Sequence, residues 1–121
     1  RLRLKRISFE GFQNPEKYYA RASVFCLTSA FEGFGLVLVE ASAFGCVPMA
    51  FNSYPTADEI IRSGTNGILV PAFDLRRYAD ELRLLMRNNA LRNQFSVAAH
   101  KNATRFSVEN IIPLWENVLK N

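Results

Sequence analysis

The chain has 121 residues, enough for one ordinary domain with its own core, and 49% of them are hydrophobic, which excludes a disordered tail. Its formal net charge is +4, from 15 Lys and Arg against 11 Asp and Glu. Because the basic residues form no dense block interleaved with aromatic residues, we expect no nucleic-acid partner. Attraction to an anionic phosphate ligand, or peripheral contact with an anionic membrane surface, fits this charge equally well.

The sequence also bears on the compartment. No run of 18 apolar residues and no signal peptide is visible. Cys26 and Cys46 lie in apolar runs without metal-ligand neighbours, which predicts two buried free thiols in a reducing compartment. We therefore expect a cytoplasmic protein, with membrane association left open. Since the chain begins at Arg1 and enters a strand-like pattern at once, we also expect it to be a fragment of a longer protein.

Strand and helix patterns alternate along most of the chain. Uncharged apolar runs predict strands buried on both faces, and apolar residues at a helical spacing predict helices. In chain order we expect a half-exposed strand (residues 2–9), a helix (15–22), a buried strand (23–28), a loop (29–35), a helix (36–44), a buried strand (46–51), a short helix (57–62), a buried strand (68–70), a helix capped by Asp74 (75–87), a helix (90–105) and a helix capped by Ser107 (108–120). This alternation predicts an α/β fold, a Rossmann-like parallel sheet with helices on both faces, ending in two or three helices.

The loop at residues 29–35 is the first candidate site. It leaves the carboxyl end of a strand and opens a helix, which is where open parallel sheets bind ligands. Gly33 and Gly35 let a ligand approach the backbone, and the amides at the helix start favour an anion, above all phosphate. The loop lacks the features of a Walker motif and of the full dinucleotide fingerprint. Glu32 would repel a phosphate, so we expect it to face a neutral hydroxyl.

Glu40 is the only charged residue between Gly33 and Pro55. A buried, unpaired carboxylate is expensive, so we expect Glu40 to be hydrogen-bonded. Neighbouring backbone amides and a bound ligand are both open as partners.

Three groups of residues, which begin at Ser29, Glu40 and Glu59, follow one another in the order and at the spacings of a known family. They resemble the carboxyl-terminal, donor-binding domain of GT-B fold glycosyltransferases of family four, the glycosyl transferases group 1. Glu32 and Glu40 match that family's Glu-x7-Glu signature. The likeness runs from about residue 7 to residue 115, and it implies that residues 1–121 are a single partial domain, without the acceptor domain and the start of the donor domain. The matching groups are Ser29, Glu32, Gly33, Phe34 and Gly35; Glu40, Ala41, Ala43, Gly45 and Pro48; and Glu59, Ile60, Ile61, Gly64, Asn66, Gly67, Leu69 and Val70.

The resemblance implies retaining, metal-independent transfer of a sugar from a UDP-, GDP- or ADP-sugar to an acceptor such as a cell-surface polysaccharide or glycolipid precursor. It implies no cofactor, no metal ligand, and no catalytic acid or base among the matched residues. Carried over by position, the donor sugar would contact Glu32, Gly33 and Phe34, the pyrophosphate would contact Gly33, Phe34, Gly35 and Leu36, and the ribose hydroxyls would contact Glu40.

The sequence departs from the family pattern in places. Thr28 stands where the family commonly has Pro, and residues 52–55 replace a glycine-rich stretch, so that Tyr54 could alter the sugar pocket. The family's basic residues for the leaving diphosphate, and its acceptor domain, would lie before Arg1. We therefore expect this chain alone to turn over no donor.

Other interpretations remain. Glu32 and Glu40 could form the acid and nucleophile of a glycoside hydrolase, although a helix start between them suits hydrolysis poorly. A nucleotide-sugar epimerase of similar fold and a non-catalytic nucleotide-binding module are closer alternatives. We expect His100 to lie on a helix surface and Trp115 to pack, in part against the other domain of such an enzyme. Phe31 and Phe34 suit either the core or a pocket wall.

Overall fold

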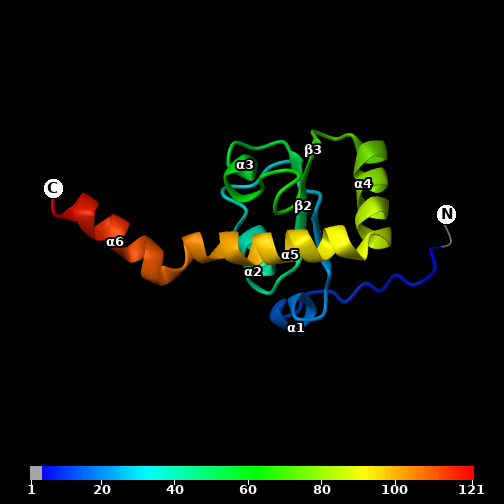
Figure 1. Ribbon diagram of the computed structural model, residues 1–121, viewed down its shortest axis with the longest axis horizontal. Coiled ribbons are helices and arrows are strands. Elements are labelled where there is room, and N and C mark those ends of the chain that lie inside the picture. The colour runs from blue at the N-terminus through cyan, green and yellow to red at the C-terminus, as the bar shows by residue number, and fades with distance from the viewer. Residues whose placement is uncertain (1–3) are drawn as a thin grey trace.

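The computed structural model of the protein describes residues 4–121 and contains a three-stranded parallel sheet with the strand order β1-β2-β3 (Figure 1). The strands are β1 (Val24–Leu27), β2 (Val47–Asn52) and β3 (Ile68–Pro71). Val24 pairs with Val47, and Met49 pairs with Ile68. The three uncharged runs therefore pair in parallel, in the order in which the sequence presents them.

Helices connect and follow the strands, as the fold class predicts. Helix α4 has the bounds expected from its apolar spacing, and the carboxylate of Asp74 caps it by accepting a hydrogen bond from the backbone amide of Arg77 at 3.0 Å. Helix α6 begins after Ser107, although the Ser107 side chain makes no capping hydrogen bond. The helices are α1 (Glu16–Tyr19), α2 (Leu36–Ala43), α3 (Ala57–Ile60), α4 (Leu75–Arg87), α5 (Asn89–Ala103), the 3-10 turn η1 (Thr104–Phe106) and α6 (Val108–Leu119).

Apolar side chains pack on both faces of the sheet, with β2 at the centre. Five of the six residues of β2 are buried, and successive side chains point to opposite faces. One face packs against α4 and α5, and the other against α2 and the region of α3. The first face is built from Val47, Met49, Phe51, Ile68, Val70, Tyr78, Leu85 and Phe95, and the second from Leu38, Ala50, Tyr54, Ala57, Ile60 and Ile61. The prediction of helices on both faces is confirmed.

Helix α5 runs across α2, and α6 then extends away from the sheet (Figure 1). Two side chains of α5 reach the end of α2: the Ser96 hydroxyl donates to the Gly45 carbonyl at 2.6 Å, and His100 Nδ1 lies 2.8 Å from the Ala43 carbonyl oxygen. His100 is exposed, as expected. None of the residues of α6 is buried, and the Trp115 side chain is 62% exposed, so Trp115 does not pack within this chain. The packing expected against another domain stays a prediction.

The predicted first strand is also wrong where the structure describes it. Residues 4–9 form no strand, and Phe9 is 92% exposed; residues 2 and 3 lie outside the described part. An alternating pattern becomes a strand only where a neighbouring strand supplies hydrogen bonds, and residues 4–9 pair with no strand of residues 4–121. The following helix is shorter than predicted and ends at Tyr19.

Strand β1 is half-buried rather than buried, because it is an edge strand of the sheet that residues 4–121 form. Both cysteines are free, as expected, but Cys26 on β1 is exposed. Cys46 is buried, with its Sγ 3.3 Å from the Tyr19 carbonyl oxygen. The prediction of two buried thiols therefore holds for Cys46 only.

Among the described residues, no helix combines the length and apolar composition needed to cross a bilayer.

Candidate functional site

The loop at residues 29–35 lies at the carboxyl end of β1, beside the loop that follows β2. Because β1 and β2 are parallel neighbours, both loops leave the same edge of the sheet. The Thr56 hydroxyl donates to the Phe34 carbonyl at 2.9 Å, and the Ser53 hydroxyl lies 3.4 Å from the Ser29 carbonyl oxygen. The loop after β2 thus holds the glycine loop in place, and no pattern in the sequence around Thr56 indicates this role.

Gly35 provides the turn into α2. Its φ is +89°, in the left-handed region that favours glycine, and it occupies the N-cap position of α2 without a capping side chain. The Gly35 carbonyl accepts from the Leu38 amide at 2.9 Å. Within residues 4–121, no hydrogen bond from the backbone amides of Gly33, Phe34 or Gly35 is found. These amides, at the positive end of a helix, are available to an anion.

Tyr54 lies directly beneath this turn. Its side chain is 5% exposed, and a β-carbon added to Gly35 would lie 3.3 Å from its hydroxyl oxygen. The hydroxyl is buried and has no hydrogen-bond partner among the described residues. Burial raises the pKa of Tyr54, and the negative charge of Glu32 raises it further, which indicates that Glu32 is close. Tyr54, which stands in the stretch where the family has glycine-rich residues, therefore places a hydroxyl without a partner among the described residues under the loop at residues 29–35.

Glu32 is half-buried, whereas Glu40 is exposed. Among residues 4–121 the Glu40 carboxylate has neither a hydrogen bond nor an ion pair, so the expected bond to neighbouring backbone amides is not formed, and the bond to a ligand stays a prediction. The reason is helical geometry. Helix α2 buries Leu38 against the sheet, and Glu40, two residues later at about 3.6 residues per turn, faces the opposite side.

Glu40 borders a hollow of about 380 Å³ between α2 and the end of α5. Its walls are mainly apolar, with Leu36 and Val39 on one side and Phe106 on the other. Burial raises the pKa of Tyr19, and the negative charge of Glu40 raises it further. The second effect indicates that Tyr19 lies near Glu40. The two carboxylates of the predicted signature therefore have different neighbours.

Phe34 packs against Phe106 in an edge-to-face manner, with ring centroids 5.7 Å apart and an angle of 67° between the ring planes. Phe34 is half-buried and Phe31 is exposed, which places Phe34 in the wall of the loop and Phe31 outside the core. Phe106 was not expected at this site. It comes from η1, more than seventy residues later in the sequence, and no local pattern could have indicated the contact.

Within the described part of the chain, no cluster of three or more His, Cys, Asp or Glu could hold a metal ion. The geometry defines an α/β protein with a Rossmann-like parallel sheet, an uncapped helix start and a glycine loop at the carboxyl edge of the sheet.

The chain belongs to the family described as glycosyl transferases group 1, which it matches over residues 2–102. It is 37% identical over 107 residues to an exopolysaccharide phosphotransferase of Streptomyces coelicolor, a match that covers 88% of the chain and 11% of that protein. It is 33% identical over 102 residues to an uncharacterized glycosyltransferase of Haemophilus influenzae, covering 84% of the chain and 29% of that protein. The chain thus spans less than a third of either relative.

A solved structure agrees with this assignment. The chain is similar to Anabaena HepE, whose structure is in complex with UDP and glucose, with a TM-score of 0.86 and 25% identity; the match covers 95% of the chain and 32% of HepE. The Rossmann-like fold expected from the resemblance is confirmed.

Proposed function

We propose that the chain is the donor-binding part of a retaining glycosyltransferase that takes its sugar from a nucleotide sugar. One observation carries the proposal: the amides of Gly33, Phe34 and Gly35 have no partner among residues 4–121, and they lie at the start of α2 on the carboxyl edge of the sheet. Membership of the glycosyl transferases group 1, and the UDP and glucose in the HepE complex, support it.

In this proposal each part of the donor has its own position. The pyrophosphate meets the amides of residues 33–36, where the helix dipole favours negative charge. Glu32 accepts hydrogen bonds from hydroxyls of the donor sugar, and Glu40 accepts them from the ribose. The different surroundings of Glu32 and Glu40 support separate partners, because Glu32 is half-buried near Tyr54 and Glu40 is exposed near Tyr19.

The proposed transfer uses no metal and no other cofactor. Basic residues outside this chain, together with the start of α2, neutralise the leaving diphosphate, and the chain supplies no catalytic acid or base. Glu32 and Glu40 suit a hydrolase less well, because a hydrolase needs both carboxyl groups to flank one glycosidic bond. Here the uncapped start of α2 lies between them in the sequence.

The acceptor, in this proposal, is a cell-surface polysaccharide or glycolipid precursor that is bound by another domain and assembled in the cytoplasm, near the membrane. The name of the Streptomyces relative supports a polysaccharide product. That relative is matched over 11% of its length, so the phosphotransferase chemistry in its name is not carried over to this chain.

The test is an NMR titration of the isotope-labelled chain with UDP-, GDP- and ADP-glucose. We expect one of them to shift the amide signals of Gly33 and Gly35. Glu40→Ala should weaken binding of that donor by about tenfold, the loss of one charge-assisted hydrogen bond pair. Glu116→Ala, which removes an exposed carboxylate of α6, is the control and should leave binding unchanged. Absence of any shift with all three donors would contradict donor binding by this chain.

Glu32→Ala separates the two carboxylates. It should weaken binding of the nucleotide sugar by about tenfold and leave binding of the free nucleoside diphosphate unchanged, because only the sugar contacts Glu32. Equal losses for both ligands would contradict the assignment of Glu32 to the sugar. We also expect the chain alone to transfer no sugar. Conversion of the donor to its epimer in the same sample would favour the epimerase instead.

A further inference from the structure

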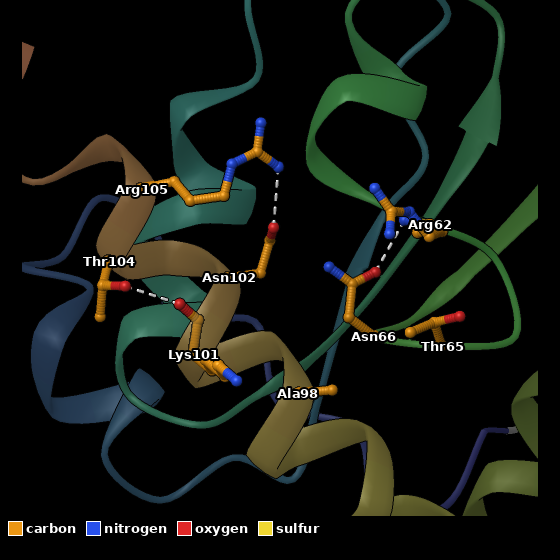
Figure 2. A pocket seen from close by; sticks show the side chains of 8 residues that line it. All are labelled: Arg62, Thr65, Asn66, Ala98, Lys101, Asn102, Thr104 and Arg105. Atoms are coloured by element: carbon orange, nitrogen blue, oxygen red, sulfur yellow. Dashed lines mark hydrogen bonds between the residues drawn. The ribbon is translucent and has the colours of Figure 1, made fainter. Parts of the chain in front are cut away.

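A second hollow, of about 440 Å³, opens between the turn that follows α3 and the end of α5 (Figure 2). None of the residues proposed to bind the donor lines it. One wall comes from the turn and the other from α5 and η1. Its lining residues are Arg62, Thr65 and Asn66 on the first wall and Ala98, Lys101, Asn102, Thr104 and Arg105 on the second.

The base of this hollow is fixed by two asparagine side chains. Asn66 is only 4% exposed, and its amide donates to the Ile60 carbonyl at 3.1 Å. The amide of Asn102 donates to the same carbonyl at 2.9 Å, and Asn66 Oδ1 accepts from the Arg62 backbone amide at 2.7 Å. The two walls are therefore joined through one carbonyl group, that of Ile60.

The charged groups of the hollow all have the same sign. Arg62, Lys101 and Arg105 line it, and no Asp or Glu does. The ion pairs found within residues 4–121 lie on α4 and α6 and involve none of these three cations. Asn102 Oδ1 accepts from Arg105 Nη1 at 3.0 Å, which orients the guanidinium. Figure 2 shows Arg62 and Arg105 on facing walls with both asparagine side chains between them.

Three positive charges line one cavity, so an anion that enters it is attracted by each of them. Guanidinium groups match the paired oxygens of a phosphate, and an ammonium adds a third donor. The hollow is larger than a single phosphate requires and falls in the size range of small-molecule sites, so there is room for the group that carries the phosphate.

We propose that this hollow binds a phosphate monoester or diester, separately from the donor, through Arg62, Lys101 and Arg105. The phosphate can belong to a soluble compound or to a lipid headgroup. The ligand oxygens accept hydrogen bonds from the three cationic side chains, and Asn102 keeps Arg105 oriented toward them.

The experiment titrates the full labelled chain with glycerol 3-phosphate and, separately, measures co-sedimentation with vesicles of phosphatidylglycerol and of phosphatidylcholine. We expect amide shifts at Asn66, Lys101 and Arg105 if the soluble phosphate binds, and sedimentation with phosphatidylglycerol vesicles alone if the source is a lipid. Either result supports binding of a phosphate ester in the hollow and shows whether that phosphate belongs to a soluble compound or to a lipid.

Variants connect the binding to the hollow. The double variant Arg62→Gln/Arg105→Gln should weaken binding by about tenfold or more, because it removes both guanidinium forks. The control Arg76→Gln removes an exposed arginine of α4 and should leave binding unchanged. Any shifts at Gly33 and Gly35 should persist in the double variant, which separates this site from the donor loop. No binding in either assay, or equal weakening by Arg76→Gln, overturns the proposal.

Discussion

The region around β2 and the last helix, α6, differ in how much of their apolar surface the chain itself buries. Five of the six side chains of β2 are buried, and they form the centre of both packed faces. Helix α6 buries none of its residues, although Ile112, Leu114 and Trp115 are all apolar and exposed. The apolar core of the described residues is therefore built around β2, and the glycine loop of the candidate site is held by residues that follow β2.

The candidate site depends on the β2 region for its support. The loop at residues 29–35 is held by Thr56 and supported from below by Tyr54, both of which follow β2. A change near β2 should alter stability and donor binding together, whereas a change in α6 should alter neither in the isolated chain.

The largest effect is expected at Gly67, beside the start of β3. A β-carbon there would lie 2.3 Å from the Pro48 carbonyl oxygen and 3.1 Å from Ile61 Cγ2. Since the nearest neighbour is buried backbone, Gly67→Ala should lower the free energy of unfolding by about 3 kcal/mol. Urea unfolding measures it, with Gly33→Ala as control, because a β-carbon at Gly33 meets nothing within 4 Å. Equal stability of the two variants would show that β2 and β3 are less tightly packed than described.

A smaller loss is expected for Gly35→Ala. The left-handed conformation and the contact at 3.3 Å with the Tyr54 hydroxyl should together cost about 2 kcal/mol, and the donor should bind more weakly because the loop shifts. Thermal unfolding and the donor titration measure the two effects. If donor affinity fell while stability stayed at the wild-type value, the loop would be independent of the β2 region.

Tyr54→Phe should change stability in the opposite direction. It removes a buried hydroxyl that has no partner within the described residues, and we expect a gain of about 1 kcal/mol. The same urea experiment measures it. A loss of stability would mean that the Tyr54 hydroxyl has a hydrogen-bond partner in solution. The double variant Gly35→Ala/Tyr54→Phe then tests whether contact with this hydroxyl causes the loss expected for Gly35→Ala.

The smallest effect is expected at Trp115. Because its side chain is 62% exposed, Trp115→Gln should change the free energy of unfolding by less than about 0.5 kcal/mol. Leu85→Ala is the contrast: Leu85 is fully buried against the β2 face, and its truncation should cost about 3 kcal/mol. A large loss for Trp115→Gln would contradict the description of α6 as unpacked against the rest of the chain.

The sequence was sufficient for features that depend on neighbours along the chain. The apolar spacing and the cap at Asp74 gave α4 its exact bounds, and the glycines at 35 and 45 mark the two ends of α2. The position of the glycine loop at the carboxyl edge followed from the order of strand, loop and helix. The roles of Glu32, Glu40 and the residues between them stay predictions.

Only the tertiary structure decided which surfaces are covered. The alternating pattern at residues 4–9 formed no strand, Cys26 is exposed on an edge strand, and Glu40 faces away from the sheet. Three features of the structure join residues that are far apart in sequence. They are the contact of Phe34 with Phe106, the position of the Tyr54 hydroxyl under Gly35, and the three cations around one hollow. The physical reason is that spacing and caps are local properties of the chain, whereas burial and pairing depend on what another segment brings to the same place.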